Sequence, residues 1–145
     1  MTDLTLDAAQ TIVADALKYA VAHKLIPLAV VVLDARGAPK ALAAQDGTSL
    51  KRTDVARGKA FGALALGMGS RSIFKRAKEQ PYFVTAVGQT LEGSLIPVPG
   101  GVLIRDADGK VLGAVGISGD TSDNDEAAAM AGIAAAGLKG DPGAD

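Results

Sequence analysis

The chain has 145 residues, a formal net charge of −1 and no cysteine. This length suits one domain with its own core, and the lack of cysteine excludes disulfides, thiolate chemistry and cysteine-bound metal centres. The scattered Lys and Arg form no basic patch for nucleic acid, and no apolar run reaches the roughly 20 residues of a membrane helix. The first ten residues lack the basic start of a secretory signal. We therefore expect a cytoplasmic protein that binds neither nucleic acid nor membranes.

The first part of the chain predicts a helix followed by a hairpin. Apolar residues recur at helical spacing over residues 6–21, with Thr5 placed as the N-cap. Residues 28–33 are rich in β-branched side chains, and a turn at 34–37 ends in glycine. A second apolar stretch follows at 40–44, so the two segments predict an antiparallel β-hairpin.

The middle of the chain predicts two helices and a long loop. The helices span residues 53–66 and 70–80, separated by a Gly-Met-Gly segment and closed by Pro81. Residues 82–99 contain several Gly and Pro interruptions and predict a loop with little regular structure.

The last part repeats the strand–turn–strand pattern. Residues 102–105 and 110–118 flank an Asp-Ala-Asp-Gly turn and predict a second hairpin. An Ala-rich helix is expected over residues 123–137. The resulting order is α-β-β-α-α-β-β-α, and tight hairpins imply antiparallel pairing, so the fold class is α+β. We expect a single domain over residues 1–139 and a flexible tail over 140–145.

Lys59 interrupts an apolar helix arc. It lies four residues after Val55 and four before Ala63, at the edge of that arc. A lysine there either extends along the surface to solvent or directs its ammonium into a pocket. In the second case it would act as an anion anchor or as an amine of lowered pKa.

The Val-Pro-Gly-Gly segment at residues 98–101 is the second candidate feature. Pro99 stiffens the approach, and Gly100 and Gly101 allow the backbone to come close to another group. Their N–H groups are suited to an anion. The alternative is a tight entry into a strand.

An acidic helix start is the third candidate feature. Ser122 and Asp125 fit a capping box, and Asp123, Asp125 and Glu126 suit the positive end of a helix dipole. One interpretation of these acids is helix capping, and the other is a metal site. Because no histidine lies beside them and their spacing matches no known metal-binding loop, we predict no metal site.

His23 is the single histidine of the chain. It follows the first predicted helix, where a cation suits the dipole. One reading is a surface residue, and the other is the one imidazole available for haem iron or for acid–base chemistry.

Several motifs occur together in a fixed order. They are LDAAQTIVADAL, VVVLDARG, the Asp-Gly at 46–47, ARGKA around Lys59, VPGG, IRDADGKVLGAVGISG and the acidic run that ends in Glu126. In this combination the chain resembles the GlcG/HbpS-like family, also called the haem-degrading domain family, over residues 4–136.

The resemblance implies a profilin-like fold, with a central antiparallel sheet flanked by helices. It also implies homo-oligomers, from dimers to octamers, and haem as a cofactor of better-known members. With no cysteine, His23 is the axial candidate for haem in this chain. The pocket carried over by motif consists of Lys59, Pro99, Gly100, Gly101, Gly116, Ser118, Gly119, Asp125 and Glu126.

Three functions remain open at this point. The first is a binding protein for haem or a related tetrapyrrole. The second is a hydrolase, lyase or isomerase acting on a small carboxylate- or oxo-bearing catabolite. In that enzyme Lys59 would anchor the carboxylate, the VPGG amides would polarise an oxygen, and Asp125 or Glu126 would move a proton. The third is an oligomeric accessory protein without a ligand.

Overall fold

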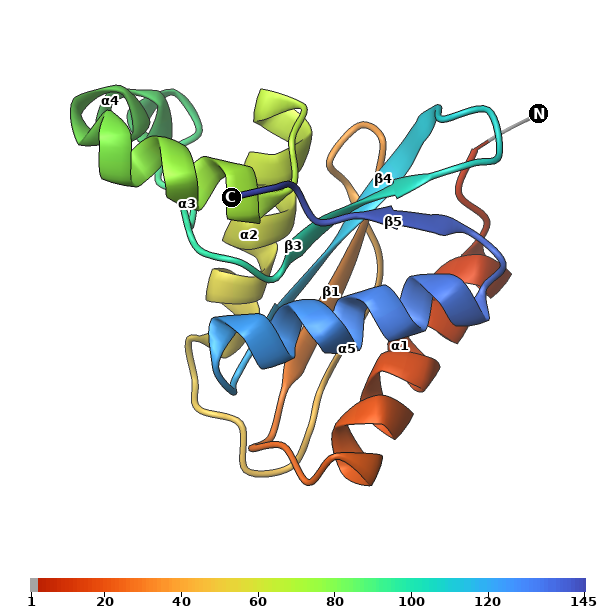
Figure 1. The fold of residues 1–145 in the computed structure, drawn as a ribbon. Coiled ribbons are helices and arrows are strands. Elements are labelled where there is room, and N and C mark those ends of the chain that lie inside the picture. The colour runs from red at the N-terminus through yellow and green to blue at the C-terminus, as the bar shows by residue number, and fades with distance from the viewer. Residues whose placement is uncertain (1–2) are drawn as a thin grey trace.

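The computed structural model describes residues 3–145 and consists of a sheet between layers of helices (Figure 1). The elements in chain order are α1 (Leu6–Ala22), β1 (Ala29–Asp34), β2 (Pro39–Ala44), α2 (Arg52–Leu66), α3 (Ser70–Glu79), α4 (Pro81–Thr90), β3 (Gly101–Arg105), β4 (Val111–Ser118), α5 (Ser122–Ala135) and β5 (Lys139–Asp141). The predicted α+β class, with a central antiparallel sheet flanked by helices, is confirmed. The observed order contains the predicted one and adds α4 and β5.

The sheet joins the two predicted hairpins side by side. Its strand order is β2-β1-β4-β3-β5, and each neighbouring pair is antiparallel. The hairpins meet where β1 pairs with β4, with Val31 opposite Gly116. Since β1 and β4 lie inside the sheet and are buried nearly throughout, they read as continuous apolar runs.

The strands alternate their side chains between two cores. Val30 and Val32 face a cluster with α1 and α5, whereas Val31 and Leu33 face a cluster with α2. Successive side chains of a strand point to opposite faces. The fold therefore has three layers, with α1 and α5 on one face and α2 on the other.

The α2 layer lies very close to the sheet because both surfaces carry small residues. A Cβ added at Gly116 of β4 would lie 1.8 Å from the carbonyl oxygen of Ala56 in α2. A Cβ at Gly101 of β3 would lie 2.3 Å from the carbonyl oxygen of Lys59. The abundant Gly and Ala thus set the spacing between layers.

The predicted loop at residues 82–99 is wrong in its first half, which forms α4. Pro81 occupies the first turn of this helix, where a missing N–H costs nothing. Val84 of α4 packs with Ile73 and Leu95 in a small satellite core. Pro81 follows the end of α3, as predicted, and is also the first residue of α4, which was not predicted.

The C-terminal residues, which we expected to form a flexible tail, are tied to the rest of the chain. In β5, Gly140 pairs with Ile104 of β3, and Asp141 accepts a hydrogen bond from Arg105 at 3.0 Å. The backbone N–H of Ala144 then donates to Ser72 Oγ in α3 at 2.8 Å. The short strand covers what would be an open sheet edge at β3.

No helix within residues 3–145 combines the length and apolar character needed to cross a membrane.

Candidate functional site

Lys59 forms a buried ion pair with Asp125. Its Nζ lies 3.2 Å from Asp125 Oδ2 and donates to the carbonyl oxygen of Ile117 at 2.8 Å. Lys59 is 2% exposed and Asp125 1% exposed. Of the two orientations open to Lys59 from the sequence, the structure therefore shows the inward one.

The carboxylate of Asp125 is held from a second side by the loop before α5. The N–H of Asp120 donates to Asp125 Oδ1 at 3.0 Å. The capping box predicted for Ser122 and Asp125 is not formed, because Thr121 is the N-cap and accepts from the N–H of Asn124 at 3.2 Å. The cap position one residue earlier turns Asp125 into the core.

Burial brings the pKa values of the pair closer together. Desolvation lowers the pKa of Lys59, against the attraction of Asp125. Desolvation likewise raises the pKa of Asp125, against the attraction of Lys59 and the hydrogen bond from Asp120. Both charges thus depend on each other, as expected for an ion pair removed from water.

The VPGG segment packs directly on Lys59. A Cβ at Gly100, where φ is +121°, would lie 2.9 Å from Lys59 Nζ. The N–H of Gly101 donates to Ser70 Oγ at 2.7 Å, while Pro99 is buried at the entry to β3. The glycines allow close approach, as predicted, but the group they approach is α2 of the same chain.

The remaining predicted pocket residues line the end of β4. Buried Ser118 accepts a hydrogen bond from Arg52 Nη1 at 3.0 Å, and a Cβ at Gly119 would lie 2.2 Å from the carbonyl oxygen of Pro27. Sequence reasoning missed Arg52 because nothing local links the first residue of α2 to a serine 66 positions later.

Glu126 lies in a separate ion-pair network on the surface of α5. Arg71 of α3 holds its carboxylate with two hydrogen bonds, Nε to Oε1 at 2.9 Å and Nη2 to Oε2 at 3.2 Å. Arg71 also pairs with Asp123 and Asp145. Its hydrogen bonds, first of all those to Glu126, raise the pKa of the Arg71 guanidinium. A carboxylate engaged in this way is an acceptor rather than a free base.

His23 lies apart from these two networks, at the exposed end of a helix. It is the C-cap of α1, and its ring stacks on Tyr19 with centroids 3.8 Å apart. The carbonyl oxygen of Tyr19 lies 2.9 Å from His23 Nδ1 and also accepts the backbone N–H of His23 at 3.0 Å. No hydrogen bond within residues 3–145 joins His23 to the Lys59–Asp125 pair.

The family model for haem degrading protein HbpS-like matches residues 4–134. The chain belongs to the HbpS-like family. Among curated proteins, no relative matches it. The motifs that suggested this family were therefore read correctly.

Solved structures agree with the HbpS-like assignment. A PduOC–haem complex has a TM-score of 0.84 at 23% identity, with 94% of this chain and 97% of that chain covered. Protein ORFY of Klebsiella pneumoniae gives 0.82 at 25%, covering 94% and 93%. A double mutant of Streptomyces reticuli HbpS gives 0.78 at 27%, covering 92% and 87%. These likenesses extend over almost the whole fold.

In this HbpS-like chain the predicted site residues fall into three groups. Lys59, Asp125 and the glycine segments meet in a closed network whose buried polar atoms all have partners within the described residues. Glu126 belongs to the Arg71 network, and His23 stands apart with its ring exposed. Of these, the imidazole is the group exposed to solvent.

Proposed function

We propose that this HbpS-like protein binds haem or a closely related tetrapyrrole, with Nε2 of His23 as the axial ligand to iron. The observation that carries this proposal is the 2.9 Å contact between His23 Nδ1 and the carbonyl oxygen of Tyr19. Membership of a family described as haem degrading supports the choice of ligand.

We assign the tautomer of His23 from its contact with Tyr19. A carbonyl oxygen has no proton to give, so Nδ1 must carry the proton and donate it. In the neutral ring Nε2 then holds a free lone pair. Metal-binding histidines are commonly held in this way, because the second hydrogen bond orients the ring and increases the basicity of the ligating nitrogen.

The surroundings of His23 also suit a flat apolar macrocycle. Tyr19 stacks on one side of the imidazole, and Ile26, three residues after His23 in the chain, is 63% exposed although it is apolar. Lys24 is exposed next to His23 and offers a cation for a propionate. Bound haem would supply a redox-active iron, and the chain's own part is to hold and orient it.

We infer further that the working form is a homo-oligomer, between dimer and octamer. Several large apolar side chains lie on the surface of one chain, among them Leu50 at 90% and Tyr82 at 71% exposure. A second copy covering such side chains would remove apolar area from water. Sedimentation velocity at micromolar protein tests this, and a monomer would contradict it.

The alternative function, an enzyme acting on a small carboxylate, has less support. The ammonium of Lys59 is already paired with Asp125, so a substrate carboxylate would have to displace a buried partner. Native mass spectrometry of the untreated protein distinguishes the two functions, since a retained tetrapyrrole and a retained small acid differ greatly in mass.

The direct test is an absorbance titration of the purified protein with haem. Wild type should develop a shifted Soret band with saturable binding, and His23→Ala should lose that shift. Imidazole added to the variant should restore it. Tyr19→Phe is the matched control, because it keeps the stacked ring and the backbone carbonyl. Identical titrations of wild type and His23→Ala would contradict the proposal.

A further inference from the structure

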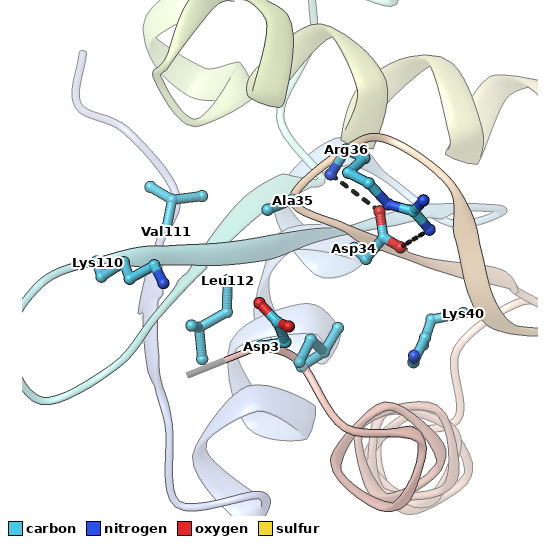
Figure 2. A pocket seen from close by; sticks show the side chains of 9 residues that line it. Asp3, Asp34, Ala35, Arg36, Lys40, Lys110, Val111 and Leu112 are labelled. Carbon is cyan, nitrogen blue, oxygen red and sulfur yellow. Dashed lines mark hydrogen bonds and ion pairs between the residues drawn. The ribbon is translucent and has the colours of Figure 1, made fainter. Parts of the chain in front are cut away.

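A pocket lies at the far end of the sheet from the Lys59–Asp125 pair. It has a volume of about 230 Å³ and is formed where the β1–β2 turn, the start of β4 and the segment before α1 meet (Figure 2). Its lining residues are Asp3, Leu4, Asp34, Ala35, Arg36, Lys40, Lys110, Val111 and Leu112. Pockets for drug-sized ligands measure roughly 300–1,000 Å³, so this one suits a smaller molecule.

Two β-bulges direct side chains to this pocket. Between β1 and β2, Val32 pairs with Ala41 and Leu33 with Pro39, which leaves Lys40 as the extra residue. Between β3 and β4, Ile104 pairs with Gly113 and Arg105 with Val111, which leaves Leu112 as the extra residue. Bulges re-aim single side chains and are over-represented beside binding sites. Both extra residues line the pocket.

Some charged side chains of the pocket have partners in the described part of the chain, and others have none there. Asp34 holds the hairpin turn, accepting from the N–H groups of Arg36 and Ala38 and from the Arg36 guanidinium at 2.9–3.1 Å. Within residues 3–145, neither Asp3 nor Lys40 has an ion-pair partner. Lys110, the remaining charged residue of the lining, takes part in another interaction. The carboxylate of Asp3 and the ammonium of Lys40 therefore remain available.

Beside Asp3 and Lys40, the pocket is lined by apolar residues that are anchored in the core. Leu4 is 3% exposed and Leu112 6% exposed, and both belong to the main core. Thr5, directly after Leu4, caps α1 by accepting from the N–H of Ala8 at 3.1 Å. Leu4 thus holds the backbone next to Asp3 on the protein, and Figure 2 shows Asp3 between Leu112 and Lys40.

From these observations we infer that the pocket binds a small zwitterion of the aliphatic amino-acid type. The ligand's ammonium faces Asp3, its carboxylate faces Lys40, and its aliphatic part rests on Leu4 and Leu112. A simple anion leaves Asp3 unpaired and a simple amine leaves Lys40 unpaired, so neither satisfies both groups. This inference is independent of haem and of His23.

Isothermal titration calorimetry with three probes tests the charge assignment. The probes are L-leucine, 4-methylpentanoate, which lacks the ammonium, and isopentylamine, which lacks the carboxylate. We expect L-leucine to bind at least about tenfold more tightly than either single-charge probe, equivalent to about 1.4 kcal/mol. His23→Ala should bind L-leucine as wild type does, which keeps this result separate from the haem proposal.

Two variants and their matched controls locate the site. Asp3→Asn should weaken L-leucine and isopentylamine about tenfold and leave 4-methylpentanoate unchanged. Lys40→Gln should weaken L-leucine and 4-methylpentanoate and leave isopentylamine unchanged. The controls Asp46→Asn and Lys18→Gln remove exposed charges outside the pocket. Circular dichroism confirms that each variant is folded. The inference is overturned if folded wild type gives no heat with L-leucine up to about 10 mM, or if the controls weaken binding as much as the pocket variants.

Discussion

Lys59 and Asp125 come from helices on opposite faces of the sheet, yet their charged atoms lie 3.2 Å apart. Lys59 belongs to α2 and Asp125 to α5, and the contact passes the end of β4 at Ile117. The absent side chain of Gly100 leaves room for the ammonium. This pair is therefore a cross-link between the two helical layers.

Breaking the cross-link from either side should destabilise the fold strongly. Lys59→Met and Asp125→Asn should each cost about 3–5 kcal/mol, because each leaves a buried charge without its partner. The double variant should cost less than the sum, by about 0.5–3 kcal/mol. Urea denaturation of the four proteins measures this coupling, and strictly additive costs would show that the pair does not interact as described.

The free energy of unfolding of Asp125→Asn should also depend on pH. Burial lowers the pKa of Lys59, so the lysine of Asp125→Asn, now without its counter-charge, should lose its proton at lower pH than an exposed lysine. Below that pKa the folded variant carries an unpaired charge. The stability deficit of Asp125→Asn should therefore shrink as the pH rises toward 10.5, the ordinary lysine value.

The close layers predict a severe effect at Gly116. Gly116→Ala should cost roughly 3 kcal/mol or more, because its Cβ would lie 1.8 Å from a backbone oxygen that cannot move aside cheaply. Gly109→Ala is the matched control, since φ is +85° there and nothing lies within 4 Å. It should cost only about 1–2 kcal/mol of backbone strain. Thermal unfolding that ranks the two variants in the reverse order would contradict the assigned layer spacing.

Asp120 should make the loop before β1 sensitive to acid. Its pKa is lowered from 3.8, chiefly by the hydrogen bond from Asn124 and then by those from the N–H groups of Ile26 and Thr121. A lowered pKa stabilises the folded state fully above 3.8, and this contribution is lost as the pH falls through the folded-state value.

Nuclear magnetic resonance measures this effect directly. The carboxyl carbon of Asp120 should titrate below pH 3.8, and exchange of the Ile26 amide should accelerate over the same range. Asp120→Asn keeps an acceptor for Ile26 but has no proton to gain, so its Ile26 amide should not follow pH there. A wild-type-like response in that variant would contradict the assignment.

Removing the C-terminal residues should weaken the fold. A chain ending at Leu138 loses the pairing of β5 with β3 and the hydrogen bond from Ala144 to Ser72. We expect a loss of about 1–3 kcal/mol and an increased tendency to associate through the exposed β3 edge. Thermal unfolding and gel filtration measure both. Unchanged behaviour of the truncated chain would show that these residues are a tail after all.

Local signals in the sequence were enough for most of the fold. Turn glycines at 37 and 109 and the apolar runs between them predict both hairpins, and helical spacing predicts α1 with Thr5 as its cap. The prediction of a loop after Pro81 was wrong, because a proline that follows one helix can also occupy the first turn of the next. The sequence also misled at residues 139–141, where a short polar strand forms only because β3 offers an edge.

The candidate site shows the limit of the same reasoning. Helical spacing placed Lys59 near an apolar face, but its partner Asp125 lies 66 residues away, and no spacing rule connects them. The glycines were rightly read as points of close approach, whereas what they approach is set by tertiary packing. The tautomer of His23 depends on a carbonyl oxygen one turn earlier, which becomes visible only with the helix end in place.

The most direct test of the haem assignment is resonance Raman spectroscopy of the ferrous haem complex. The chain contains a single histidine, so any iron–histidine stretching band must come from His23. We predict such a band, a shift of it to lower frequency when the protein is labelled with nitrogen-15, and its loss in His23→Ala. A haem complex that has no iron–histidine band, or that keeps the same spectrum in His23→Ala, would contradict the account.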